Sequence, residues 1–370
     1  MGNHYYCRWL EEVCFKMKKI IILLFALMML SVTAFAGETT LLKRTIFITP
    51  QKFLRYWKNP KAAEPVYNTN SWYPNVQFDL LGPIESGSKL YVEIDRAAGT
   101  PWLTIKMDTP TLEDDVWETI KPDSISSDDE EKQASIETGT FNFRIRMKNA
   151  LAGTDKVMFA GKFKVVQLTL DQNIPENKGK KEFMVDYDWM LPIGYVWVNP
   201  VDDAEVPYIS TQVCLKGNLE AGKGEAYLFY NGKQIGKSTM TTNSTKNVLT
   251  SGADEPHHRY SIVQYDFNYV RAFNKSPSMN DYSQNFFIDK NPGSYEIKIL
   301  RNNQLVRTMN FTVGKDGKIV DNGIASGAEM GGVRMIFPAK ISGTLDGTFN
   351  AAAWQTDALF GNPLQGFAAQ

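Results

Sequence analysis

Strict alternation between apolar and polar residues recurs along this chain and constrains its fold more than any other feature. It is clearest in residues 103–108, 141–148, 263–269 and 308–313. Successive side chains of a β-strand point to opposite faces, so each pattern places one face on an apolar core and the other in water. Antiparallel sheets have this arrangement. Asn231-Gly232 lies between two apolar stretches and predicts a tight hairpin turn. We therefore predict an all-β fold.

Helical signals are few. Residues 49–57 predict a short helix, with Thr49 as the N-cap and Pro50 in the first turn. A second short helix is predicted within residues 350–360.

Similar segments occur in the same order in the two halves of the chain. Residues 46–50, 73–82 and 139–146 resemble residues 196–200, 208–217 and 293–300, with variable spacing. A constant order with variable spacing predicts one fold used twice with different loop lengths. We therefore predict two tandem antiparallel β-sandwich domains, at residues 44–170 and 194–320, joined by a polar linker over 171–193.

The two domains resemble immunoglobulin-like or fibronectin-like sandwiches at the level of pattern only. The Cys…Trp…Cys signature of antibody domains is absent, and the sequence resembles no particular family. Residues 321–370 are rich in Gly and Ala and predict a tail that is either loosely ordered or docked on a sandwich.

The N-terminus carries the three parts of a secretory signal peptide. Lys18-Lys19 is followed by the apolar run 20–30 and by Ala34-Phe35-Ala36, which has the form of a cleavage site. The run is shorter than the roughly 20 residues that span a bilayer. We expect cleavage after Ala36, although an uncleaved membrane anchor is the alternative. Residues 1–16 fit no signal peptide and are interpreted as an extension upstream of the true start.

This signal predicts an exported protein that is not integral to the membrane after cleavage. Its Lys-Lys opening and compact form are typical of bacterial export, so we expect a periplasmic, cell-surface or extracellular location. Cleavage removes Cys7 and Cys14 and leaves Cys214 without an internal disulfide partner. Cys214 is predicted to point into the second sandwich, with Val213 facing the other way.

The sequence lacks the residues and motifs that several kinds of catalytic or cofactor-binding site require. His257 and His258 are the only histidines after cleavage, and they lie in a Gly- and Pro-bounded stretch that predicts a solvated loop. No Gly-x-Ser-x-Gly elbow, phosphate loop or dinucleotide fingerprint occurs. The formal net charge of −1 gives no field to attract nucleic acid. We predict no cofactor and no nucleic-acid partner.

Carboxylates leave two options open. A glycosidase pair could come from the acidic runs at residues 113–115 and 128–131 or from the pairs Asp186/Asp188 and Asp202/Asp203, although charged runs in loops are usually solvated. Calcium is the second option, and its candidate ligands are Asp186, Asp188, Asp202 and Asp203. None of them lies in an EF-hand loop.

Aromatic residues supply the candidate ligand-binding side chains. Trp57, Trp72 and Tyr73 fall in a Pro- and Asn-rich stretch that does not alternate, and we expect it to be a loop. Exposed rings can stack on sugars or other partners. The opposing interpretation is that most tryptophans pack in a core or between domains.

The leading functional hypothesis is an exported, non-catalytic tandem β-sandwich protein with a binding or structural role at the cell envelope or outside the cell. A protein or glycan is the expected partner. The alternatives are a carbohydrate-active enzyme with paired carboxylates and a two-domain periplasmic chaperone-like protein that lends an edge strand to a client.

Overall fold

The computed structural model describes residues 38–55, 66–124, 127–169, 181–199, 208–216, 224–246, 260–267, 286–321 and 334–359. The predictions for the signal peptide, Trp57, Asp202, Asp203, His257 and His258 lie outside these ranges. Antiparallel strands dominate the described ranges, which confirms the all-β prediction. No helix within them is long and apolar enough to cross a bilayer.

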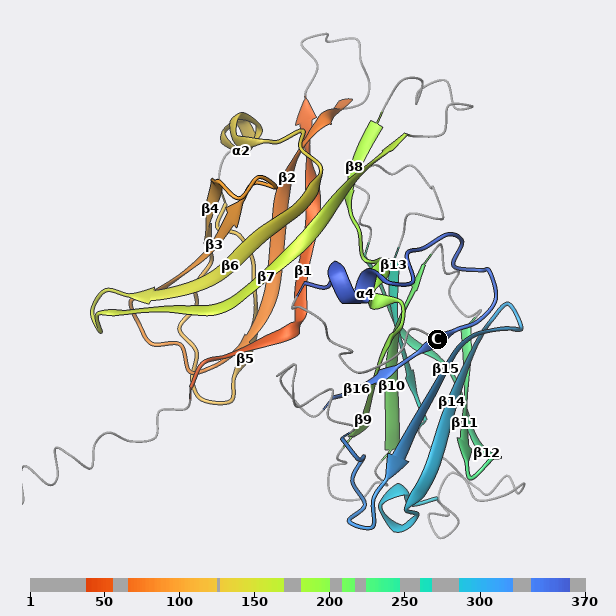
Figure 1. Ribbon diagram of the computed structural model, residues 1–370. Coiled ribbons are helices and arrows are strands. Elements are labelled where there is room, and N and C mark those ends of the chain that lie inside the picture. Colours follow the sequence, from red (N-terminus) through yellow and green to blue (C-terminus); the bar gives the residue numbers. More distant parts are fainter. Residues whose placement is uncertain are drawn as a thin grey trace, which may run out of the picture.

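Strands β1–β8, which we call the N-terminal unit, form two facing sheets (Figure 1). One sheet has the order β1-β2-β5, with bounds Thr40–Arg55, Val66–Leu81 and Trp117–Ile120. The other has the order β4-β3-β6-β7-β8, with bounds Pro101–Met107, Ser88–Asp95, Gly139–Asn149, Thr154–Thr169 and Lys181–Val185. Alternate residues, among them Phe78 on β2 and Val92 on β3, are buried in one apolar cluster. Burial of these faces holds the two sheets together.

Strands β9–β17, which we call the C-terminal unit, form one continuous sheet that turns back on itself. Its order is β16-β9-β10-β13-β12-β11-β14-β15-β17. The bounds, in that order, are Met335–Pro338, Ile193–Asn199, Tyr208–Lys216, Tyr260–Asp266, Lys233–Lys246, Gly224–Tyr230, Gly293–Arg301, Gln304–Val313 and Lys340–Ile341. Strand β12 pairs with β11 through its first part, up to Thr239, and with β13 from Met240 onward, with a register shift between Met240 and Thr242. This strand therefore links the part of the sheet that contains β13 to the part that contains β11.

The two units share a strand order. The arrangement β1-β2-β5 and β4-β3-β6-β7 recurs as β9-β10-β13 and β12-β11-β14-β15. The similar segments of the sequence occupy corresponding places, because residues 139–146 lie on β6 and residues 293–300 lie on β14. Phe141, Phe143, Tyr295 and Ile297 on these strands are buried.

The helix predicted at residues 49–57 is wrong. Residues 49–55 continue β1, and Thr49 and Pro50 pair with Asn75 and Pro74 of β2. Cap residues are a local signal, and pairing with a distant strand overrides it. The described helices of a full turn or more are α2 (Ser127–Gln133), which coincides with an acidic run, and α4 (Ala353–Thr356), which lies within the second predicted helix.

The described part of the predicted linker is packed rather than exposed. Residues 181–185 form β8 against β7, and the short 3-10 helix η2 (Asp188–Met190) follows with Trp189 buried. A second 3-10 helix, η5, spans Ile288–Lys290.

Residues 334–359, which we call the C-terminal segment, are docked on both units. Strand β16 pairs with β9 and β17 pairs with β15, which covers both edges of the C-terminal unit's sheet. The chain then crosses to the N-terminal unit, where the carbonyl of Leu359 accepts a hydrogen bond from the N–H of Lys162 (3.0 Å). Helix α4 lies between the units (Figure 1).

One apolar cluster extends across the junction. The outer face of β9-β10-β13 contributes Tyr195, Cys214 and Tyr260 to the same buried cluster as Phe141 of the N-terminal unit. Trp354 of α4 belongs to it as well. A separate cluster fills the interior of the C-terminal unit.

Candidate functional site

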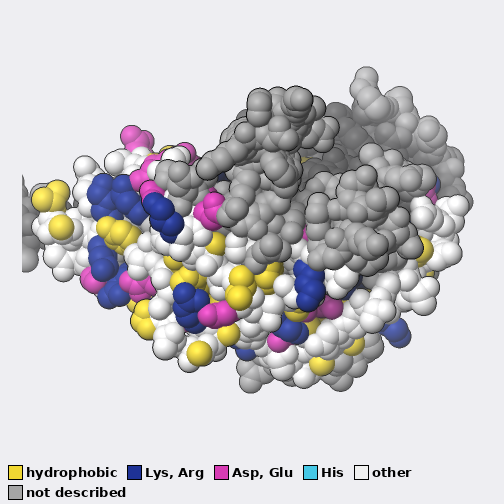
Figure 2. Space-filling view, turned by 90° about the horizontal axis from the view of Figure 1, so that it is seen from above, with side chains coloured by type: hydrophobic (Ala, Val, Ile, Leu, Met, Phe, Trp, Pro, Cys, Tyr) yellow, Lys and Arg dark blue, Asp and Glu magenta, His cyan; other side chains and the backbone are white. Residues whose placement is uncertain are grey.

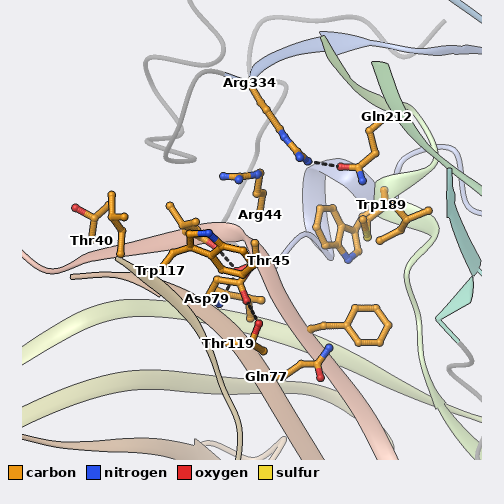
Figure 3. Close-up of a pocket in the computed structure, with 16 residues that line it drawn as sticks. Thr40, Arg44, Thr45, Gln77, Asp79, Trp117, Thr119, Trp189, Gln212 and Arg334 are labelled. Carbon is orange, nitrogen blue, oxygen red and sulfur yellow. Dashed lines mark hydrogen bonds between the residues drawn. The ribbon is translucent and has the colours of Figure 1, made fainter. Parts of the chain in front are cut away.

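A cleft of about 670 Å³ lies between the N-terminal and C-terminal units (Figure 3). Its walls are the sheet β1-β2-β5 on one side and η2, β10, β13 and the start of the C-terminal segment on the other. A cleft of this size accommodates a small organic molecule. Its described lining residues are Thr40, Leu42, Arg44, Thr45, Ile46, Phe47, Gln77, Asp79, Leu81, Trp117, Thr119, Trp189, Met190, Gln212, Ile262 and Arg334.

A bulge in β1 brings Arg44 to this cleft. Residues 43–46 of β1 lie opposite Phe78 of β2, where regular pairing would place a single residue. Thr45 fixes the bulge, because its Oγ1 donates to a backbone carbonyl in β1 (2.8 Å) and accepts from the backbone N–H of Asp79 (2.7 Å). Bulges re-aim side chains and are frequent beside functional sites.

Arg334 approaches the same space from the opposite wall (Figure 3). Its Nη1 donates to Oε1 of Gln212 (2.8 Å), and its guanidinium carbon lies 4.1 Å from the centre of the Trp197 ring. Burial and, secondly, the charge of Arg44 lower the pKa of Arg334 to about 10. Burial also lowers the pKa of Arg44. Both side chains remain cationic at neutral pH, so the cleft holds two neighbouring positive charges.

The remaining polar groups lie mainly on β2 and β5. Asp79 is the one carboxylate among the described lining residues, and its Oδ1 accepts a hydrogen bond from Thr119 Oγ1 (2.7 Å). Trp117, also on β5, is 64% exposed. Trp189 on the opposite wall is buried (Figure 3). The cleft thus combines paired cations, one carboxylate, hydroxyl and amide groups and an accessible indole ring.

The two described aromatic candidates lie elsewhere. The expected loop around Trp72 and Tyr73 is wrong, because both residues lie in β2 and are buried. Trp72 meets Phe141 edge-on at 5.1 Å, and its Nε1 donates to the carbonyl of Glu137 (2.9 Å). Burial raises the pKa of Tyr73 to about 12. Neither ring offers a free face to a ligand in this conformation.

Asp186 and Asp188 are engaged by protein groups. Asp188 Oδ1 accepts from Lys216 Nζ (2.8 Å) and from the Tyr260 hydroxyl (2.7 Å), and Oδ2 accepts from the N–H of Asn350 (2.8 Å). Burial and, secondly, the charge of Asp188 raise the pKa of Asp186. Within the described ranges, no group of three or more His, Cys, Asp or Glu side chains is placed to hold a metal ion.

Cys214 is buried, but its predicted direction is wrong. Val213 belongs to the interior cluster of the C-terminal unit, whereas Cys214 belongs to the cluster that spans the junction. Lys216 follows two positions later on the same face of β10 and reaches Asp188 of η2. Burial raises the pKa of the Cys214 thiol far above its usual range.

Sequence reasoning missed Arg44, Arg334 and Trp117 as site residues. Arg44 and Arg334 come from distant parts of the chain, and the fold alone brings them together. Comparison with known proteins adds no candidate, since no protein-family model and no curated protein matches the chain.

Proposed function

We propose that this chain is an exported, non-catalytic protein of two immunoglobulin-like domains that binds a partner at the cell envelope or outside the cell. The observation that carries the proposal is the cleft between the units, where the charges of Arg44 and Arg334 face the same space. Two sandwiches joined by a continuous apolar cluster would present such a cleft as a rigid, preformed site.

The shared strand order supports the immunoglobulin-like assignment and a duplicated domain. In each unit the first, second and fifth strands form one sheet and the third, sixth and seventh lie in the other, as in immunoglobulin sandwiches. In the N-terminal unit the fourth strand pairs with the third instead of the fifth, and in the C-terminal unit it pairs with both. We place the domains near residues 44–170 and 194–320, the first extended by β8 and the second completed by the C-terminal segment.

The cleft gives less support to the enzyme alternative. A glycosidase requires two carboxylates across its cleft. Asp79 alone supplies one among the described lining residues, and Thr119 donates to it.

The edges of the C-terminal unit give less support to the chaperone alternative. Strand donation requires an open edge, and the short strands β16 and β17 cover β9 and β15.

Surface charge favours a partner other than nucleic acid. Over the N-terminal unit, basic and acidic side chains lie beside one another in the view from above (Figure 2). Arg144 pairs with Glu93 and Asp95, and Arg146 pairs with Glu93 and Asp155. Nucleic-acid surfaces instead gather unpaired Lys and Arg on one face.

The test uses the mature chain from residue 37 on arrays of glycans and peptides. Thr40 is exposed and lines the cleft, so Thr40→Trp should obstruct it, whereas Thr104→Trp places the same ring on an exposed position of β4 outside it. We expect at least one ligand to be retained by the wild type and by Thr104→Trp but lost by Thr40→Trp. Binding that Thr40→Trp leaves intact, or no retention of any ligand, contradicts the proposal. New reducing ends on a bound glycan would contradict its non-catalytic part.

A further inference from the structure

We propose that the cleft recognises a carboxylated sugar unit, whose carboxylate lies between Arg44 and Arg334 and whose ring packs on Trp117. This inference rests on the proposed function and names the chemistry of its ligand.

The arginine pair is the first reason to expect an anion. The contacts of Arg334 among the described residues are with the neutral Gln212 amide and the Trp197 ring, and the charge of Asp266 acts on Arg334 without a described ion pair between them. The charge of Arg44 disfavours that of Arg334. A bound anion would remove this repulsion, and guanidinium groups match carboxylates with two parallel hydrogen bonds.

A carboxylate in the lining favours a singly charged ligand. Asp79 lies on the β2 wall of the cleft. A phosphate near its second ionisation would bring two negative charges toward Asp79, whereas a carboxylate brings one.

Both arginines are held in place before a ligand arrives. The bulge of β1, fixed by Thr45, positions Arg44. Gln212 and the face of Trp197 hold Arg334. Groups held in position in this way lose little conformational entropy on binding, so their contacts contribute fully to affinity.

The rest of the lining suits a sugar ring. Trp117 lines the cleft and is 64% exposed, so its ring offers an accessible apolar surface there. An indole face can pack on the C–H face of a pyranose while its neighbours bind the hydroxyls. Thr40, Gln77 and Gln212 supply donors and acceptors for them.

The test is an array of oligosaccharides that carry glucuronic, galacturonic, mannuronic or sialic acid, each beside its carboxyl-reduced counterpart. Peptides with a free C-terminal carboxylate form a separate arm. We expect the mature protein to retain at least one acidic glycan and to lose it when the carboxyl group is reduced. Retention should fall as salt rises, because the attraction is between charges.

Arginine variants locate the binding. Arg44→Ala and Arg334→Ala should each weaken retention about tenfold or more, since each removes a charge-assisted contact. Arg96→Ala is the matched control: Arg96 also lies over a tryptophan, Trp102, but pairs with Glu137 away from the cleft. Trp117→Ala should weaken binding and keep the preference for the carboxylate. Circular dichroism and thermal unfolding of each variant separate lost binding from lost folding.

The outcomes distinguish this inference from the proposed function. Equal retention of reduced glycans, or retention of peptides alone, overturns the inference but keeps the proposed function if Thr40→Trp abolishes the binding. Retention of no acidic glycan, or retention unchanged in folded Arg44→Ala and Arg334→Ala, also overturns it.

Discussion

Single residues at the junction carry buried charge that the fold must compensate. Arg307 is fully buried, and its guanidinium donates to the carbonyls of Leu191 and Cys214. Asp346 of the C-terminal segment lies 2.6 Å from it and supplies the opposite charge. Asp346 also accepts from the backbone N–H of Lys216 (3.0 Å). One carboxylate thus satisfies a buried cation and ties the C-terminal segment to β10.

Replacement of Asp346 should destabilise the fold strongly. Asp346→Ala leaves the Arg307 charge buried without compensation, and breaking such a pair costs about 3–5 kcal/mol of unfolding free energy. Asp346→Asn keeps an acceptor for Lys216 and should cost less. Urea denaturation measures both. Asp123→Ala removes the acid of the exposed Lys106–Asp123 pair and should leave the unfolding free energy unchanged. Equal effects at the two sites would contradict this account of the junction.

The raised pKa of Asp186 predicts how the unfolding free energy depends on pH. Its folded pKa is raised by burial, so the folded state binds this proton more tightly than the unfolded state. Its stabilising contribution is complete below the unfolded pKa of about 3.9 and is lost as pH rises through the folded pKa. In Asp186→Asn this loss is absent. The unfolding free energy of the variant relative to wild type should therefore increase with pH across this interval in urea titrations, and a constant or shrinking difference would refute the assignment.

Among the strands and helices, the bulge in β1 has the most direct effect on the cleft, because it places Arg44 in the lining. Thr45 bridges the bulge to β2 through Asp79, and Arg44 lies beside it. The bulge therefore links strand pairing to the position of a binding group.

Thr45→Val tests this link. The variant keeps the shape of the side chain but leaves the Asp79 N–H without its acceptor, which costs about 1–3 kcal/mol. Ligand retention should fall as well, because Arg44 loses its support. Thr109→Val is the matched control, since Thr109 Oγ1 accepts from the N–H of Leu90 (3.0 Å) far from the lining. It should lower stability, measured by urea denaturation, and leave binding intact. A similar loss of binding in both variants would show that the bulge has no specific role.

Local patterns predicted the strands well and the site poorly. Alternation over 141–148 identified β6, because burial on one face imposes that period. Pro74 and Asn75 led to the prediction of a loop around Trp72, because both are turn-forming residue types and the pairing of β2 with β1 cannot be read from the local sequence. The sequence did not show which face of β10 points into the C-terminal unit, because both faces are buried, one inside that unit and one at the junction. The prediction for Cys214 therefore assigned the wrong face. The arginine pair has no local signal, because Arg44 and Arg334 meet only through the packing of the two units.

At the scale of the whole molecule, the C-terminal segment joins the two units. It supplies edge strands to the C-terminal unit, and Leu359 bonds to β7 of the N-terminal unit. Asp357 forms an ion pair with Lys164 (3.0 Å). Trp354 is buried in the cluster that spans the junction. The cleft lies at this junction, so its geometry depends on these contacts.

Trp354→Ala should uncouple the two units. Deleting a buried tryptophan side chain costs about 3–5 kcal/mol, and here the loss falls on the contact between units rather than inside one of them. We expect the wild type to unfold in one transition in calorimetry and the variant in two, with ligand retention reduced because the walls of the cleft are no longer fixed. Trp72→Ala is the control, since Trp72 packs inside the N-terminal unit against Phe141. It removes the same side chain and should lower stability without weakening the junction. If Trp354→Ala kept one transition and full binding, the cleft would be held by other contacts than those of the C-terminal segment.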